Sequence, residues 1–352
     1  MGLPETMAGV RLVGHGGPER LCWSDDIAVP RPGPGEVLVK VLAAGVNNTD
    51  INTRLGWYAP EVTAATGEGI VAEAGGWNGA LQFPRIQGAD LCGRVVALGD
   101  GVVGLKVGAR VTCPTMQAEP QPGAPLAYVS LGSEYDGAFA AYCRVPERHL
   151  FDVTASPLSD EEIGAMPCAF GTALNLLTRA GVSEGQDVLI TGASGGVGLA
   201  AVMLARLMGA RITGVTDKSK ADAVRMAGAV AVLARDAAPE PRSFDAVIDI
   251  VGGPGWADRL AGLRPGGSCA VSGAIAGPIV QMDLRRVYLD DLTIRGCTHQ
   301  PPEVFARLVG IINDGAVRPL ISRSYPLRDI AAAQADFLSK RYPGKIVLVP
   351  SE

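Results

Sequence analysis

The sequence lacks the cysteine patterns that point to metal-binding or disulfide-rich proteins. Its seven cysteines are scattered along 352 residues, their number is odd, and no two of them form a CxxC pair. In a chain of this length such usage argues against a disulfide framework and favours a reducing compartment, so we expect a cytoplasmic protein. The three histidines are isolated as well, without the neighbours of a metal motif.

An excess of positive charge is also missing. Lys and Arg number 31 against 36 Asp and Glu, which leaves a net charge of −5 and argues against a nucleic-acid-binding surface over the whole protein. Residues 1–8 show no signal peptide, since no basic region precedes an apolar core. Residues 188–205 form an uncharged run long enough for a membrane span, but four glycines interrupt its middle, so we expect no membrane segment.

The chain does have the length of two domains, and it is rich in glycine. Its 46 glycines are about twice the usual share of ~7%, which indicates many tight turns. Strand-like alternation marks residues 35–46, 90–98 and 109–113. Residues 59–83 and 116–133 have no clear period and are expected to be loops, the first an insertion with at most one short helix and the length of a lid or binding loop.

From about residue 160 short apolar segments alternate with longer amphipathic ones. Strands that alternate with helices predict a parallel sheet covered by helices on both faces. The expected strands are 187–191, 211–216, 230–233, 246–251, 268–272 and 292–296, with helices at 197–208 and 218–227, and the chain ends with helix 302–314, strand 320–325, helix 329–340 and strand 345–349.

One motif stands out at residues 187–210, which read DVLITGASGGVGLAAVMLARLMGA. An apolar strand leads directly into Ala193-x-Gly195-x-x-Gly198, and a helix begins there. This is the dinucleotide-binding pattern with Ala in the first glycine position: the turn is tight, the backbone can approach a pyrophosphate, and the helix N-terminus faces the anion. The alternative is a tight strand–helix turn without a ligand.

The end of the following strand bears on which dinucleotide is bound. An NAD enzyme usually has Asp or Glu there to hold the ribose hydroxyls. Thr216 stands in that place, and Lys220 follows within four residues, which suits a 2′-phosphate. Asp217 would repel a phosphate, and the two lysines at 218 and 220 could be a solvated helix start. We favour NADP(H).

Several segments together resemble the medium-chain dehydrogenase/reductase superfamily over essentially the whole chain. They are PGPGEVLVKVLAAGV at 32–46, GDGVVGLKVGARV at 99–111, the glycine motif at 192–198, the residues 227–229, and GKIVLVP at 344–350. The resemblance implies an α/β protein with a GroES-like, strand-rich catalytic domain at 1–157 and 300–352. It also implies a Rossmann domain, with a doubly wound parallel sheet, at 158–299.

The zinc ligands of the superfamily's alcohol dehydrogenases are not all present. At the positions of the first thiolate and the histidine stand Asn47 and Ala89, and only Cys168 matches the third ligand. One thiol cannot make the three-ligand site that catalytic zinc needs, and Cys113 alone cannot replace the four cysteines of the structural zinc lobe. We therefore predict no metal, and the chain resembles the zinc-independent quinone oxidoreductases and enoyl reductases of the superfamily.

This resemblance implies the substrate class and the catalytic residues. Without a Lewis acid, conjugated acceptors are the easier substrates, because the charge spreads into an enolate that a hydrogen-bond donor can hold. We expect a quinone or α,β-unsaturated carbonyl, with catalytic roles for Asn47, Thr49 and Tyr58. Each has a structural alternative: a strand-end hydrogen bond for Asn47, a helix cap made by Thr49-Asp50, and core packing for Tyr58.

The sequence thus predicts a zinc-free, NADPH-dependent oxidoreductase. The alternatives are a cofactor-bound sensor without useful turnover and a zinc alcohol dehydrogenase with substituted ligands. A homodimer joined near 292–296 is expected from the superfamily. The residues expected to bind the cofactor are Thr172, Ala193, Ser194, Gly195, Gly196, Val197, Gly198, Thr216, Lys220 and Gly252.

Overall fold

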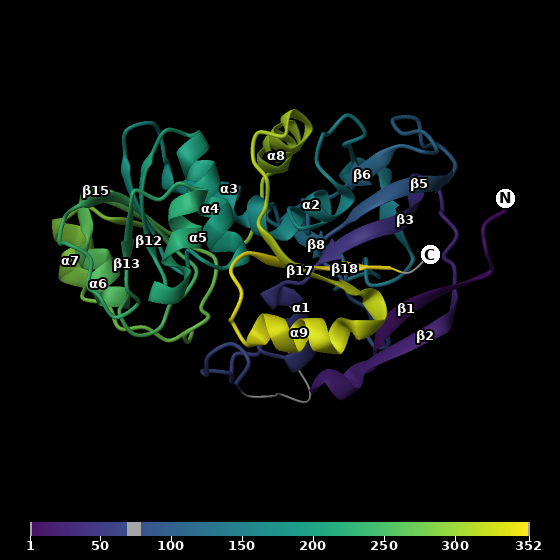
Figure 1. Ribbon diagram of the computed structural model, residues 1–352, viewed down its shortest axis with the longest axis horizontal. Coiled ribbons are helices and arrows are strands. Elements are labelled where there is room, and N and C mark those ends of the chain that lie inside the picture. Colours follow the sequence, from purple (N-terminus) through teal and green to yellow (C-terminus); the bar gives the residue numbers. More distant parts are fainter. Residues whose placement is uncertain (1, 69–78, 351–352) are drawn as a thin grey trace. The chain divides into compact units, whose positions relative to one another are not determined.

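The computed structural model describes residues 2–68 and 79–350, and the chain forms two compact units (Figure 1). Unit 1 comprises Met1–Val62, Gly69–Cys168 and Pro301–Glu352, and unit 2 comprises Thr63–Glu68 and Ala169–Gln300. Both ends of the chain therefore belong to unit 1. Unit 1 includes residues 158–168, which the sequence analysis gave to the Rossmann domain, because helix α2 (Asp160–Gly164) packs on three strands of unit 1.

A seven-stranded sheet forms the centre of unit 1. Its order is β10-β6-β5-β3-β18-β17, and β9 also pairs with β3. Because β18 pairs antiparallel with the end of β3, residues from the two ends of the chain meet at one place, with Val347 opposite Gly45. The strands are β3 (Glu36–Gly45), β5 (Cys92–Leu98), β6 (Arg110–Thr112), β9 (Tyr142–Pro146), β10 (Phe151–Asp152), β17 (Ile321–Pro326) and β18 (Lys345–Val349).

Smaller elements complete unit 1. A three-stranded sheet has the order β2-β1-β4, and a hairpin pairs β7 with β8. The strands are β1 (Thr6–Leu12), β2 (Leu21–Ala28), β4 (Arg85–Ile86), β7 (Met116–Ala118) and β8 (Tyr128–Ser130). The helices are α1 (Asn48–Leu55), α2 (Asp160–Gly164), α8 (Pro302–Asp314) and α9 (Ile330–Leu338), with 3₁₀ turns at Pro18–Arg20, Glu147–His149 and Leu327–Asp329.

Two sequence predictions for the loops have different outcomes. The prediction of a plain loop at 116–133 is wrong, because β7 and β8 pair there from Met116 opposite Ser130 to Ala118 opposite Tyr128. Proline and glycine between the two short strands concealed this hairpin. In the expected insertion, residues 59–68 contain turns and no helix, and residues 69–78 lie outside the part of the chain that the structure describes.

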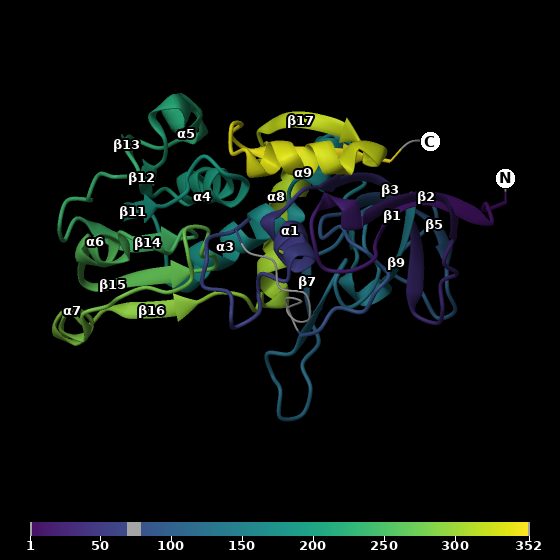
Figure 2. The same ribbon diagram turned by 90° about the horizontal axis from the view of Figure 1, so that it is seen from below.

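A parallel six-stranded sheet forms unit 2 and confirms the predicted fold class. Its order is β13-β12-β11-β14-β15-β16 (Figure 2). Since every pairing is parallel, crossover helices must cover the faces, and Figure 1 shows α3 and α4 on one face with α6 and α7 on the other. The strands are β11 (Asp187–Ile190), β12 (Arg211–Val215), β13 (Ala231–Leu233), β14 (Phe244–Asp249), β15 (Leu263–Val271) and β16 (Thr293–Gly296).

The helices of unit 2 surround this sheet, and α3 begins at the end of unit 1. They are α3 (Pro167–Ala180), α4 (Gly196–Leu207), α5 (Ala221–Ala227), α6 (Trp256–Ala261) and α7 (Leu284–Leu289), with a 3₁₀ turn at Lys218–Lys220. Sequence periodicity missed α3, α6 and α7, and it merged the 3₁₀ turn with α5. Among the described residues, no helix is long and apolar enough to cross a membrane.

Candidate functional site

The first part of the candidate site lies in unit 1, where β3 ends and α1 begins. Asn47 is the residue that joins the two elements, and its side chain is buried. The carboxylate of Asp50 accepts a hydrogen bond from the backbone N–H of Asn47 at 2.9 Å, which satisfies one of the free donors at the start of the helix. The first turn of α1 is therefore closed by a hydrogen bond between Asn47 and Asp50.

Both ends of the Asn47 amide are bound inside unit 1. Its Nδ2 donates to Asp90 Oδ2 at 2.9 Å, and its Oδ1 accepts from Lys345 Nζ at 2.5 Å. Lys345 Nζ also lies 3.0 Å from Asp90 Oδ2, so the three side chains form a closed triangle. Asp90 and Lys345 are 0% and 3% exposed, and a charge so deeply buried requires a partner of opposite sign.

Gly45 makes room for this triangle. A Cβ atom at this position would lie 2.3 Å from Asp90 Oδ2 and 3.0 Å from Lys345 Nζ. No real Cβ contact is that short, so a larger residue would have to move the buried ion pair. Glycine is therefore needed at the end of β3 because the side chains of Asp90 and Lys345 lie against its backbone, and not because the chain turns there.

A second carboxylate, that of Asp50, lies beside the triangle. Its Oδ1 accepts from the backbone N–H of Ala89 at 3.2 Å, so Asp50 connects the segment before β5 to the start of α1. Burial, reinforced by the negative charge of Asp90, raises the pKa of Asp50 to about 7, although Lys345 and the backbone N–H donors oppose the shift. Asp50 is therefore a buried acid that titrates near neutral pH.

This donor set does not fit a catalytic zinc ion. Asn47 and Ala89 occupy two of the three expected ligand positions, and the Asn47 amide is already engaged by Lys345 and Asp90. Cys168 is then the one thiol left at these three positions, and one thiol cannot make the three-ligand site that catalytic zinc needs. Over the residues that the structure describes, no group of three His, Cys, Asp or Glu side chains could hold a metal ion.

Tyr58 and Thr49 are brought together on the side of α1. The hydroxyl of Tyr58 donates to Thr49 Oγ1 at 3.5 Å, and its ring lies edge-on to Trp57, with ring centroids 5.5 Å apart. Burial raises the pKa of Tyr58 to about 12. The phenol therefore keeps its proton at physiological pH and can act as a hydrogen-bond donor.

The glycine loop of unit 2 has the geometry that the motif predicts. Gly192 has a φ of 57°, which places it in the left-handed region directly after β11. A Cβ at Gly198 would lie 2.1 Å from the carbonyl oxygen of Gly192, so only glycine lets α4 pack against the strand end. At Gly195 the nearest atom would be 3.5 Å away. Packing within the chain thus requires glycine at 198 but leaves space at 195.

A hydroxyl pair and two cations lie at the end of β12. Thr216 Oγ1 donates to Ser194 Oγ at 2.7 Å, which joins the end of the second strand to the glycine loop. Burial, together with the positive charge of Arg235, lowers the pKa of Lys220. The carboxylate of Asp217 accepts from both the backbone N–H and the hydroxyl of Ser219, at 2.9 and 2.7 Å, so it caps the 3₁₀ turn.

The space at the glycine loop and the start of α4 fit a pyridine dinucleotide. The loop around Gly195 leaves room for a phosphate to approach the backbone, and Gly196 and Val197 form the first turn of a 12-residue helix. Ala193 is fully buried beneath them. Thr172 lies on α3, and Gly252 follows β14 with a φ of 60°. All ten predicted cofactor residues belong to unit 2.

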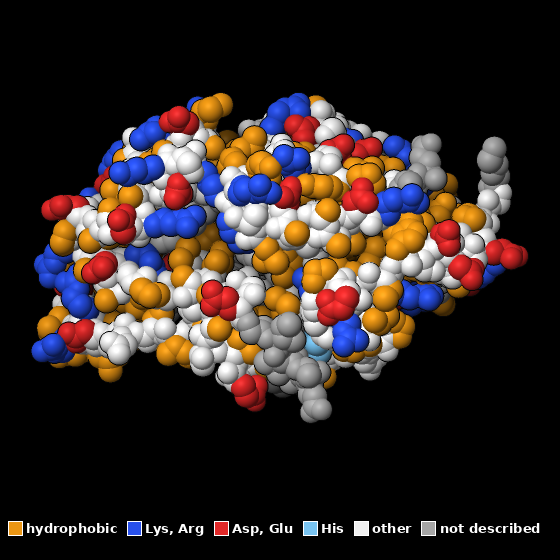
Figure 3. Space-filling view, turned by 60° about the horizontal axis from the view of Figure 1, so that its bottom comes forward, with side chains coloured by type: hydrophobic (Ala, Val, Ile, Leu, Met, Phe, Trp, Pro, Cys, Tyr) orange, Lys and Arg blue, Asp and Glu red, His pale blue; other side chains and the backbone are white. Residues whose placement is uncertain are grey.

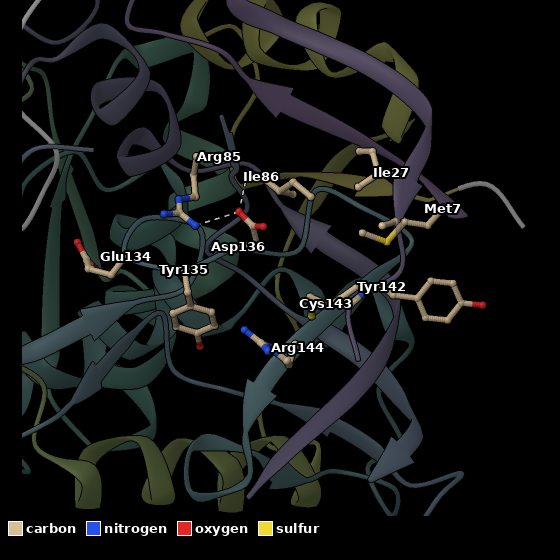
Figure 4. A pocket seen from close by; sticks show the side chains of 12 residues that line it. Met7, Ile27, Arg85, Ile86, Glu134, Tyr135, Asp136, Tyr142, Cys143 and Arg144 are labelled. Atoms are coloured by element: carbon tan, nitrogen blue, oxygen red, sulfur yellow. Dashed lines mark hydrogen bonds and ion pairs between the residues drawn. The ribbon is translucent and has the colours of Figure 1, made fainter. Parts of the chain in front are cut away.

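A cavity of about 190 Å³ lies elsewhere in unit 1 (Figure 4). Arg85 and Asp136 form an ion pair at its wall, 3.0 Å apart, and Tyr135 and Arg144 also line it. Asn47, Thr49 and Tyr58 are not among its lining residues. On the face shown in Figure 3, acidic and basic side chains are interspersed, in keeping with the mild net charge of −5.

Sequence reasoning missed Asp90, Lys345 and Arg235, and it considered Asp50 only as part of a helix cap. One signal was available for Lys345, since a lone lysine at the start of an apolar strand, KIVLV, is unusual unless the charge is paired. Its partner Asp90 lies 255 residues away, and no local pattern connects two such positions. Arg235 follows β13, and only the order of the parallel sheet brings that strand end beside β12.

Two family models match the chain. Residues 33–155 match the alcohol dehydrogenase GroES-like domain, and residues 196–314 match the zinc-binding dehydrogenase model. These matches cover the predicted strand-rich part and the parallel-sheet part in the expected order. The second description names zinc, whereas the donor set of this chain does not fit that ion.

Relatives cover nearly the whole chain. Acryloyl-coenzyme A reductase of Metallosphaera sedula is 29% identical over 92% of this chain and 95% of its own length. L-threonine 3-dehydrogenase of Streptomyces avermitilis is 31% identical over 93% and 95%. A solved structure of a Sinorhizobium meliloti 1021 protein has 39% identity and a TM-score of 0.90, covering 99% of this chain and 98% of the other. With these similarities and the nucleotide-binding geometry of unit 2, the chain belongs to the medium-chain dehydrogenase/reductase superfamily, whose members are oxidoreductases that use pyridine nucleotides.

Proposed function

We propose that this protein uses NADPH to reduce a conjugated acceptor, either an α,β-unsaturated carbonyl compound or a quinone, without zinc. The observation that carries the proposal is the closed triangle of Asn47, Asp90 and Lys345. The resemblance puts Asn47 at a zinc-ligand position, and the amide of this residue is bound at both ends, by Asp90 and by Lys345. A substrate for this site must therefore stabilise its developing charge mainly by delocalisation.

The residues of unit 1 then have distinct roles. When bound, NADPH supplies the hydride. Without substrate, the hydroxyl proton of Tyr58 goes to Thr49 Oγ1. With substrate bound, Tyr58, which stays protonated, donates this proton's hydrogen bond to the substrate oxygen where the enolate charge develops, and the Thr49 hydroxyl donates to the Tyr58 oxygen and orients it. Asn47 holds the start of α1 in place, since its amide is committed to Asp90 and Lys345. Thr49 or water returns the proton to the product.

The proposed preference for NADPH rests on the charges at the end of β12. The 2′-phosphate of NADPH carries negative charge that Lys220 and Arg235 can balance, with the Thr216 and Ser194 hydroxyls as further partners. Asp217 works against this preference, because the hydrogen bonds from Ser219 lower the pKa of its carboxyl and keep it negatively charged. The acryloyl-coenzyme A reductase among the relatives supports a conjugated substrate, while the threonine dehydrogenase supports an alcohol.

The experiment is a substrate panel with metal analysis. Purified protein is mixed with NADPH and an enone, an unsaturated thioester, a para-quinone or a saturated ketone, and the absorbance of NADPH is followed. We expect turnover with the conjugated acceptors only, unaffected by a chelator.

The variant Y58F should lower kcat by about 100-fold, whereas Y288F, at a residue 63% exposed on α7, should not. About one zinc per chain whose removal abolishes turnover would replace this proposal with a zinc alcohol dehydrogenase. NADPH binding without turnover would indicate a sensor.

We also propose a cytoplasmic homodimer joined through β16. In the described part of the chain this edge strand pairs only with β15, and Ile294 on it is 37% exposed. On the neighbouring α7, Leu284 and Leu289 are 64% and 70% exposed. An unpaired strand edge flanked by apolar side chains suits pairing with a second copy. Sedimentation should give a dimer for the wild type and a monomer for I294K.

A further inference from the structure

Asp249, the last residue of β14, is a fully buried carboxylate that the sequence analysis did not single out. Its Oδ1 accepts from the backbone N–H groups of Val251 and Gly252 at 2.7 and 3.1 Å, so it closes the turn that follows the strand. Gly252 has a φ of 60°, and this turn is where the parallel sheet presents its carboxyl edge. Ligands of such sheets bind along that edge.

The charge of Asp249 is balanced by Arg259 of α6. Arg259 Nε lies 2.8 Å from Asp249 Oδ2, and the two side chains are 12% and 0% exposed. The guanidinium also donates to the carbonyl oxygen of Gly252, the residue whose N–H the carboxylate holds. The turn at 251–252 is thus hydrogen-bonded at its N–H groups by Asp249 at the end of β14, and at the carbonyl oxygen of Gly252 by Arg259 of α6.

Thr191 extends this arrangement to the glycine loop. Its hydroxyl donates to Asp249 Oδ1 at 2.9 Å and accepts from the backbone N–H of Ile250 at 3.2 Å. Thr191 is buried and directly precedes Gly192, where the loop toward α4 begins. Asp249 therefore bonds the ends of two neighbouring parallel strands, β11 and β14, to each other.

We propose that Asp249, with Thr191 and Arg259, is a positioning group for the dinucleotide: it fixes the glycine loop and the Gly252 turn in their binding geometry. This inference rests on the proposed use of NADPH. None of the three side chains needs to touch the nucleotide, because each acts through the backbone it holds. The Oδ1 atom of this buried carboxylate accepts three hydrogen bonds and Oδ2 is ion-paired with Arg259, so a change in the arrangement leaves a charge or a donor unsatisfied.

The test removes one hydroxyl and keeps the volume. T191V loses the bond to Asp249, T191S keeps it, and T112V is the matched control, since Thr112 is also buried and donates to the carbonyl oxygen of Leu91 in unit 1. We expect T191V to raise the Kd and KM for NADPH about tenfold with kcat within about twofold of wild type. T191S and T112V should bind NADPH as the wild type does.

Two further measurements keep the outcome clear. In the protein without NADPH, T191V should speed hydrogen exchange at the amides of Val251 and Gly252, and T112V should not. R259K, which keeps the charge but loses the guanidinium fork, should also weaken NADPH binding. An unchanged Kd in T191V and R259K, or equal losses in T191V and T112V, would overturn the positioning role. Failure of the wild type to bind NADPH would instead overturn the proposed function, and unchanged exchange in T191V would then overturn this inference separately.

Discussion

Lys345 places its ammonium group 3.0 Å from the carboxylate of Asp90 in the interior of unit 1. The two residues are 255 positions apart in the chain, and they meet because β18 pairs with the end of β3. The ammonium also binds Asn47 Oδ1 and the carbonyl oxygen of Val46. A single buried cation thus binds three segments to one another: the end of β3, the start of α1 and the residue Asp90 before β5.

Removing this cation should be strongly destabilising. K345M leaves the Asp90 carboxylate buried without its charged partner, and we expect the free energy of unfolding to fall by about 3–5 kcal/mol. Urea unfolding measures the loss. K106M, at an exposed lysine, is the matched control and should change stability little. The double variant K345M/D90N should regain part of the loss; a K345M protein as stable as wild type would contradict the assignment.

Stability should depend on pH through Asp50. Its folded-state pKa of about 7 lies above the ordinary value of 3.8 for an aspartate, so the folded protein binds more protons than the unfolded chain between these values. The free energy of unfolding should therefore decrease as pH rises through that window and level off above it. Urea midpoints from pH 4 to 8 measure the slope. D50N should flatten it, whereas D100N, at an exposed position, should keep the wild-type slope.

Two glycines of the same loop should respond differently to alanine. In G198A the new Cβ would overlap the carbonyl oxygen of Gly192, so we expect a loss of about 1–3 kcal/mol in stability. In G195A the nearest atom is 3.5 Å away, and stability should be unchanged while the Kd for NADPH rises, because this is where the backbone approaches the pyrophosphate. Thermal unfolding and fluorescence titration separate the two effects. Equal NADPH affinity in G195A and wild type would place the nucleotide elsewhere.

Arg235 should distinguish the two nucleotides. R235Q removes a positive charge beside Lys220, and we expect the Kd for NADPH to rise about tenfold while that for NADH changes little. R225Q serves as the control, because Arg225 lies on the neighbouring α5 and pairs with Asp222 at 3.0 Å. Titration with both nucleotides provides the measurement. A parallel loss of NADH affinity would show that Arg235 does not read the 2′-phosphate.

The sequence by itself determined the local features, because their causes lie within a few residues. The run from Asp187 to Gly198 required a buried strand, a tight turn and a helix, since alternation, glycine spacing and helical period all agree there. The parallel sheet followed from the alternation of strands and helices.

Only the tertiary structure decided which side chains share a site. Lys345 meets Asp90, the charge of Arg235 lowers the pKa of Lys220, and Thr191 reaches Asp249 through sheet pairings that join distant segments. A local pattern cannot show such contacts, because strand order depends on how the whole core is buried. The pKa of Asp50 is also decided by the tertiary structure. A carboxyl at the start of a helix becomes an acid of pKa about 7 only when the fold removes it from water and places Asp90 near it.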